Sequence, residues 1–221
     1  MAWQKSAVVS AVVIKVTALF CLLFSHALIA KEWNVGFQML QVADSIVDNN
    51  IDVAIWYPTK LKAKEESIGV TTLVIAKDAK PIRSVRGLII ISHGFAGNFL
   101  GHNNTAQFLA KSGYVVATPT HPDWQGLRSA TVEFDPLVSR PRHIELIIDK
   151  LLSLRQFKAR SLRKRIGVIG FSLGAYSAIS AIGAIPDLTV LPAYCEVEPD
   201  DELLCAAQAR QRFDAISSAR E

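Results

Sequence analysis

The chain has 221 residues, of which 50% are hydrophobic and 20% charged, with a formal net charge of +4. This length suits one globular domain with a sizeable core, and 12 glycines and 9 prolines are too few for a fibrous or low-complexity protein. Without Lys5 and Lys15 the charge falls to +2 (22 Lys and Arg against 20 Asp and Glu), so no general attraction to nucleic acid or to anionic lipid is indicated.

Residues 1–30 differ in composition from the rest of the chain. Lys5 and Lys15 are their only charges, a short apolar core follows, and small residues precede the charged Lys31. This pattern is typical of a secretory signal peptide cleaved near Ala27 or Ala30. It predicts export to the periplasm or the extracellular space. The alternative is a retained membrane anchor, although residues 16–30 are shorter than the roughly 20 residues of a spanning helix.

Residues 31–221 read as alternating strands and helices. Short apolar runs predict strands, and runs with helical periodicity predict helices. One helix is expected to have Asn103 or Asn104 as its N-cap and to stop at Gly113, and another to have Pro141 in its first turn. The alternation predicts a mostly parallel sheet with helices on both faces. The expected strands are 35–42, 51–58, 71–76, 86–92, 114–119 and 165–170, and the expected helices are 103–113, 141–154, 172–184 and 198–221.

The run from Gly170 to Gly174 reads GFSLG and matches the G-x-S-x-G pattern. It follows a predicted strand and opens a predicted helix, which is the context of a nucleophile on a sharp strand-to-helix turn. Glycines on both sides permit that turn and the close approach of neighbouring chain. The pattern therefore identifies Ser172 as a candidate nucleophile, with a purely structural turn as the alternative.

A second motif, SHGFAGN, follows the strand that ends at Ser92. Acyl transfer needs backbone N–H donors for the oxygen that becomes negative, and a glycine-rich turn after a central strand can present one. The predicted oxyanion donors are the N–H groups of Phe95 and Leu173. His93 is expected to brace the loop rather than to act as the base.

These two motifs, with IDVAIWYP, HNNTAQFLAKSGYVVATPTHP and RPRHIELIIDKLL, resemble the α/β-hydrolase superfamily. The likeness is to secreted bacterial esterases of the dienelactone-hydrolase-like type and to platelet-activating-factor acetylhydrolases, over residues 36–184. It implies a three-layer α/β sandwich and serine-dependent hydrolysis of a small or lipid-like carboxylic ester, without metal or organic cofactor. Dienelactone hydrolases proper have cysteine at the elbow, so Ser172 favours the lipase and acetylhydrolase side.

The acid and base of the expected triad are not found. In this fold they follow the serine, yet all five histidines, at 26, 93, 102, 121 and 143, precede Ser172. Candidate acids do follow, but none ends a recognisable strand. We therefore expect residues 31–221 to be an α/β-hydrolase domain lacking its C-terminal strands, with impaired activity and an exposed sheet edge. The candidate acids are Asp187, Asp200, Asp201 and Asp214.

Two alternatives stay open at this point. In the first, the chain is a non-catalytic binding or interaction protein that keeps the pocket. In the second, it is an esterase that recruits His121 or His143 as its base. Cys195 and Cys205 lie ten positions apart in a chain predicted to be exported, which favours a local disulfide over a pair of free thiols. Nothing in the sequence indicates an oligomeric state.

Overall fold

Seven strands form one sheet in the order β3-β4-β1-β2-β6-β5-β7. A computed structural model describes residues 32–122, 135–157, 162–187, 189–201 and 205. The strands are β1 (Asn34–Asp44), β2 (Asn49–Thr59), β3 (Lys64–Ile68), β4 (Thr71–Lys77), β5 (Leu88–Ser92), β6 (Val115–Thr120) and β7 (Ile166–Gly170), and the helices are α2 (Asn103–Lys111), α4 (Pro136–Ser153), α5 (Leu173–Ala181) and α6 (Leu191–Val197). The predicted signal peptide and almost all of the predicted last helix lie outside the described residues.

The expected α/β fold is confirmed, with a sheet that is mixed. β6, β5 and β7 run parallel to one another, as do β1 and β4. β2 runs antiparallel to both of its neighbours, β1 and β6, and β3 runs antiparallel to β4. β1 and β2 are joined by a short turn, which permits only the antiparallel arrangement, whereas the strands after β5 are joined through helices.

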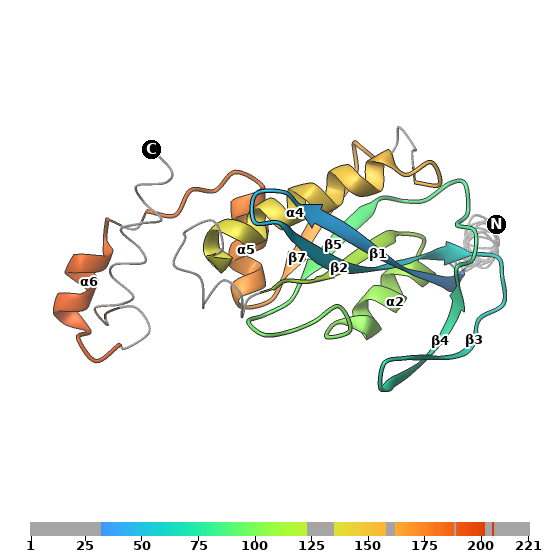
Figure 1. Cartoon of the computed structure of the whole chain (residues 1–221), viewed down its shortest axis with the longest axis horizontal. Helices are drawn as coiled ribbons and strands as arrows, with labels where there is room; N and C mark the ends of the chain where they lie inside the picture. Colours follow the sequence, from blue (N-terminus) through green and yellow to red (C-terminus); the bar gives the residue numbers. More distant parts are fainter. Residues whose placement is uncertain (1–31, 123–134, 158–161, 188, 202–204, 206–221) are drawn as a thin grey trace, which may run out of the picture. The chain divides into compact units, whose positions relative to one another are not determined.

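Helices cover both faces of the sheet (Figure 1). Alternate residues of β2 point to opposite faces, so Val53 and Ile55 pack with α4, while Ala54 and Trp56 pack with α2. α5 lies against α4 and β7. Because β2 is buried on both faces, it reads as an almost continuous apolar run, and the three layers follow from that pattern.

The predicted N-cap of α2 and the predicted start of α4 were wrong. α2 has His102 as its N-cap instead of an asparagine, and the Asn103 side chain donates backwards to the carbonyl of Leu100 at 2.9 Å. α4 begins at Pro136, before the predicted start, because the Asp135 carboxylate accepts from the N–H of Leu137 at 2.8 Å. This cap adds a turn that apolar periodicity does not reveal, and it places Pro141 inside the helix.

β3 and β7 are the two outer strands of the sheet. β3 was missed in the sequence because its segment KEESI has too few apolar residues to signal a strand. In β7 the side chains of Ile166 and Ile169 are exposed. Within the described residues β7 pairs only with β5, so its other edge is uncovered. Among these residues no helix is both long and apolar enough to span a membrane.

Candidate active site

The candidate nucleophile occupies a strained turn between β7 and α5. Ser172 has φ 53° and ψ −122°, a backbone conformation that side-chain-bearing residues rarely adopt. The side chain is exposed, and its hydroxyl makes no hydrogen bond with any described residue. The turn therefore presents the Ser172 hydroxyl to solvent at the carboxyl end of β7.

The strained turn depends on close packing against the end of β5. The Phe171 N–H donates to the carbonyl of Ser92 at 3.2 Å. A Cβ added at Gly174 would overlap the carbonyl oxygen of Ser92, and one added at Gly170 would overlap the carbonyl of Gly174. The two glycines of the motif thus let the elbow approach the strand that leads to the SHGFAGN loop.

Substitution Gly174→Ala should destabilise the protein by about 2–4 kcal/mol, because the new methyl group meets a backbone carbonyl that has no room to move. Urea unfolding followed by circular dichroism measures the effect. Gly167→Ala is the matched control, since a Cβ there meets nothing within 4 Å. Equal stability of the two variants would show that the elbow relaxes without cost.

The loop after β5 is held by a buried arginine. Arg140 of α4 is fully buried and donates through Nη1 to the carbonyl of His93 at 2.6 Å and through Nη2 to that of Gly94 at 3.1 Å. His93 Nε2 accepts from the N–H of His121 at 3.0 Å. This agrees with a bracing role for His93, because its ring is committed to backbone partners.

The predicted oxyanion donors lie on the two segments that meet here. Leu173 is the first residue of α5, where an N–H has no partner inside the helix, and it donates to no described residue. Phe95 belongs to the loop that Arg140 holds, next to Ala96, whose φ is 57°. The side chains of Phe95 and Phe171 are largely exposed, and the His102 ring lies 6.0 Å from that of Phe171.

Behind the loop, a chain of buried polar side chains runs from β5 to β1. Ser92 Oγ lies 2.9 Å from Nε2 of His121, and Nδ1 of His121 lies 3.1 Å from Nδ1 of His143. Nε2 of His143 lies 3.3 Å from Oδ2 of Asp44, with geometry too poor for a hydrogen bond. Arg142 donates to the same Asp44 oxygen at 2.7 Å.

One set of proton positions pairs Ser92, His121 and His143 with both rings neutral, while His143 Nε2 makes no hydrogen bond with a described residue. The Ser92 hydroxyl donates to His121 Nε2, the Nδ1–H of His121 donates to Nδ1 of His143, and the Nε2–H of His143 points toward Asp44. Ser92 is fully buried, so this serine is closed to an external substrate. The series of Ser92, His121, His143 and Asp44 therefore has a structural role, although its arrangement resembles a catalytic proton relay.

The surroundings keep both imidazoles neutral. Burial, aided by the positive charge of Arg140, holds the pKa of His121 well below 6.5. Burial lowers the pKa of His143 to about 4, although Asp44 acts in the opposite direction. Burial raises the pKa of Asp44, but the hydrogen bonds from Arg142 and from the Ile46 N–H outweigh it and leave that pKa below 3.8. Asp44 is thus the charged partner of the cluster.

The structure does not bring a predicted base or acid to Ser172. His121 and His143 are engaged with each other, and His93 with backbone groups. Among the candidate acids, Asp187 accepts from Thr189, and Asp201 accepts from Tyr194. Asp200 is exposed, and Asp214 lies outside the described residues.

The sequence did not single out Asp44 or Arg140, which organise the site from behind. Arg140 sits one helical turn before the apolar stripe of α4, and no motif marks it. Cys195 and Cys205 are joined by a disulfide with an S–S distance of 2.05 Å. Among the described residues no three His, Cys, Asp or Glu side chains are grouped so as to hold a metal ion.

Comparisons with known proteins support the fold alone. No family model and no curated protein matches the sequence. Among solved structures, the chain is similar to a ferulic acid esterase from Streptomyces cinnamoneus, with 19% identity and a TM-score of 0.55 over 72% of this chain. The match spans 57% of that esterase, so the chain corresponds to little more than half of its length.

Two weaker likenesses are to a protein described as m3DLH and to a lipase in its open form. For m3DLH the identity is 13% and the TM-score 0.44, covering 67% of this chain and 54% of that one. For the lipase the identity is 16% and the TM-score 0.39, covering 66% and 39%. The similarity to the ferulic acid esterase, at 19% identity, shows a shared fold.

Proposed function

We propose that this chain carries the nucleophile and the oxyanion-binding groups of a serine hydrolase that acts on carboxylic esters. The observation that carries the proposal is the elbow at Ser172, where a strained backbone with φ 53° presents an exposed hydroxyl. The N–H of the next residue, Leu173, donates to no described residue. A strained backbone of this kind persists only where the surrounding structure enforces it, and such positions cluster at functional sites.

In the proposed reaction, Ser172 Oγ attacks the ester carbonyl carbon and its proton passes to a general base. The carbonyl oxygen takes up the negative charge, and the N–H groups of Leu173 and Phe95 stabilise it. Collapse of this intermediate releases the alcohol, and water then hydrolyses the acyl-serine to the acid. No described histidine forms a hydrogen bond with Ser172, so we propose that the base is supplied from outside the described residues. The exposed rings of Phe95 and Phe171 favour substrates with an apolar group beside the ester.

A second candidate is a binding protein that keeps the elbow without turnover. The observation in its favour is that the rings of His93, His121 and His143 are each committed to other partners. A serine hydroxyl without a base is a weak nucleophile at neutral pH. Activation of Ser172 therefore separates the two candidates.

The test is covalent labelling of the full chain with a fluorophosphonate probe, read by intact mass. We expect one label per chain in the wild type and complete loss of the label in Ser172→Ala. Ser180→Ala, on the same helix α5, is the matched control and should keep the label. Unlabelled wild-type protein with a folded circular dichroism spectrum would refute the esterase proposal and favour the binding protein.

A further inference from the structure

One end of the sheet gathers exposed cations from segments far apart in the chain. Two adjoining open hollows, of about 720 and 640 Å³, share the segment from Lys80 to Arg83. Lys60 lines the first hollow and Arg155 the second, and among the described residues Asp78 is the only carboxylate that lines either. Lys60, Lys80, Arg83 and Arg155 are exposed, and none forms an ion pair within the described residues. We call these four residues the basic end.

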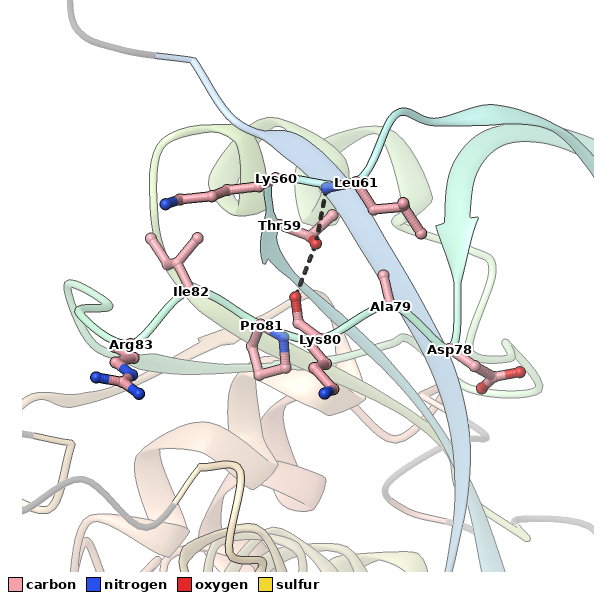
Figure 2. Close-up of a pocket in the computed structure, with 9 residues that line it drawn as sticks. All are labelled: Thr59, Lys60, Leu61, Asp78, Ala79, Lys80, Pro81, Ile82 and Arg83. Carbon is pink, nitrogen blue, oxygen red and sulfur yellow. Dashed lines mark hydrogen bonds between the residues drawn. The ribbon is translucent and has the colours of Figure 1, made fainter.

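The segment that carries Lys80 and Arg83 is fixed in place. The Tyr57 hydroxyl donates to the carbonyl of Ala79 at 2.7 Å, and the Thr59 hydroxyl donates to that of Lys80 at 2.7 Å. The Ile82 N–H donates to the carbonyl of Pro58 at 2.9 Å. Figure 2 shows Lys60 and Arg83 extending on the same side of the hollow, with Ile82 between them. The cationic side chains of Lys80 and Arg83 therefore project from a backbone segment that hydrogen bonds hold in place.

Strand directions place the basic end opposite Ser172. β2 is antiparallel to β6, so Thr59 at the end of β2 lies at the beginning of β6, whereas Ser172 follows the carboxyl end of β7. The turns that precede β5 and β7 lie at the same end as Thr59 and add more exposed cations: Arg86, Arg163 and Lys164.

An apolar tip projects from the same end. β4 pairs with β1 only through its last residues, Ala76 and Lys77, which lie beside Gly36 and Phe37 at the beginning of β1. Because the two strands are parallel, the earlier residues of β4 and the turn before them extend beyond the start of β1. Val70, in that turn, is fully exposed at 105%. A valine held clear of the domain has no packing role.

The chain also enters the domain at this end. Trp33 precedes β1, and its N–H donates to the carbonyl of Lys111 at 3.0 Å. β1 begins opposite Thr59, next to the basic end. The residues that precede Trp33 in the sequence therefore connect to the domain next to the basic end.

We propose that the basic end, with Val70, docks on the surface of an anionic phospholipid bilayer. Stable peripheral binding to a membrane generally needs two signals, and a basic patch beside an apolar insertion supplies both. Cations spread over one end of the domain suit a charged surface better than a single small anion, which needs donors that converge. This orientation leaves the end with Ser172 facing away from the bilayer.

The test is flotation of the full chain with vesicles of phosphatidylcholine, with and without phosphatidylglycerol. Apolar residues 16–30 would bind both kinds of vesicle, so the ratio of the two affinities isolates the contribution of the charges. We expect tighter binding to the anionic vesicles, weakened by added salt, and a loss on the order of tenfold in that ratio for Lys80→Gln/Arg83→Gln. The charge-preserving pair Lys80→Arg/Arg83→Lys should keep the ratio of the two affinities, because attraction to an anionic bilayer depends on the number of charges and not on their exact geometry.

Val70→Ser should lower the affinity for anionic vesicles severalfold through loss of apolar insertion. Its control is Ile46→Ser, an exposed apolar residue in the turn between β1 and β2 at the opposite end of the sheet. Equal binding to both kinds of vesicle, or an unchanged ratio in the Gln pair, would overturn the proposal. So would loss of binding in the charge-preserving pair together with competition by inorganic phosphate, which would assign a small-anion site instead.

Discussion

Acidification from neutral pH to about pH 4 should strongly destabilise this protein, through the imidazoles buried behind the candidate site. His143 is held neutral with a pKa of about 4, against 6.5 when exposed, and His121 is shifted in the same direction. Between these pH values the unfolded chain binds protons that the folded chain does not, so the free energy of unfolding falls as the pH falls. His143 alone contributes a loss of about 3 kcal/mol by pH 4.

That loss is a large fraction of the free energy of unfolding of a typical domain, which is roughly 5–15 kcal/mol. The charged groups that face the two rings are Arg140, Arg142 and Asp44, and both arginines oppose protonation of His143. Below about pH 4, protonation of Asp44 removes the partner of Arg142, which lowers the stability further.

The measurement is urea unfolding of the wild type at a series of pH values from 7.5 to 4. His143→Gln removes one titrating group and should flatten the dependence below pH 6.5, whatever its effect on stability at neutral pH. His102→Gln is the matched control, since this histidine lies outside the buried cluster, and it should keep the wild-type slope. A wild-type stability that does not change from pH 6.5 to pH 4.5 would contradict buried neutral imidazoles.

Replacement of Arg140 by alanine is expected to have the second large effect. The change removes the donors to the carbonyls of His93 and Gly94, which lie inside the protein behind the loop that presents Phe95. We expect a loss of about 3–5 kcal/mol in the free energy of unfolding, because the carbonyl oxygens of His93 and Gly94 lose their donors and a cavity forms in place of the arginine side chain.

Arg140→Lys tests whether the residue also positions the oxyanion loop. Lysine keeps the charge but lacks the planar fork that reaches both carbonyls. We expect this variant to fold and to react with a fluorophosphonate at least tenfold more slowly than the wild type, because the Phe95 N–H is misplaced. Unfolding in urea and the labelling rate are measured on the same samples. A labelling rate equal to that of the wild type in folded Arg140→Lys would restrict Arg140 to stability.

Much of the fold was predictable because its signals are local. The apolar runs of β1, β2 and β5 and the helical stripe of α4 mark their elements through residues that are neighbours in the sequence. The elbow was also predictable, since a strand, a glycine, a serine and a helix start lie within one short stretch. Within that stretch the strained φ of Ser172 and the close packing of Gly174 match the expectation from the motif.

The arrangement around the elbow depended on contacts between distant residues. Asp44 and His143 meet across 99 positions, and Arg140 reaches His93 across 47. No periodicity connects such pairs, because burial of a polar side chain depends on which strands and helices pack together. The sequence likewise does not show that Lys60, Lys80 and Arg83 lie at the same end of the sheet, because the pairing of distant strands brings them there.

The sequence by itself thus determined the order of most elements, β3 and α6 excepted, and the identity of the candidate nucleophile, since both depend on short-range patterns of polarity and backbone freedom. Only the tertiary structure decided the pairing of β2 with β6, the buried cluster of His121, His143 and Asp44, and the basic end opposite Ser172. Strand pairing brings together residues that are remote in the chain. The environment of each charge and imidazole is therefore set by packing, which a single sequence read along its length does not specify.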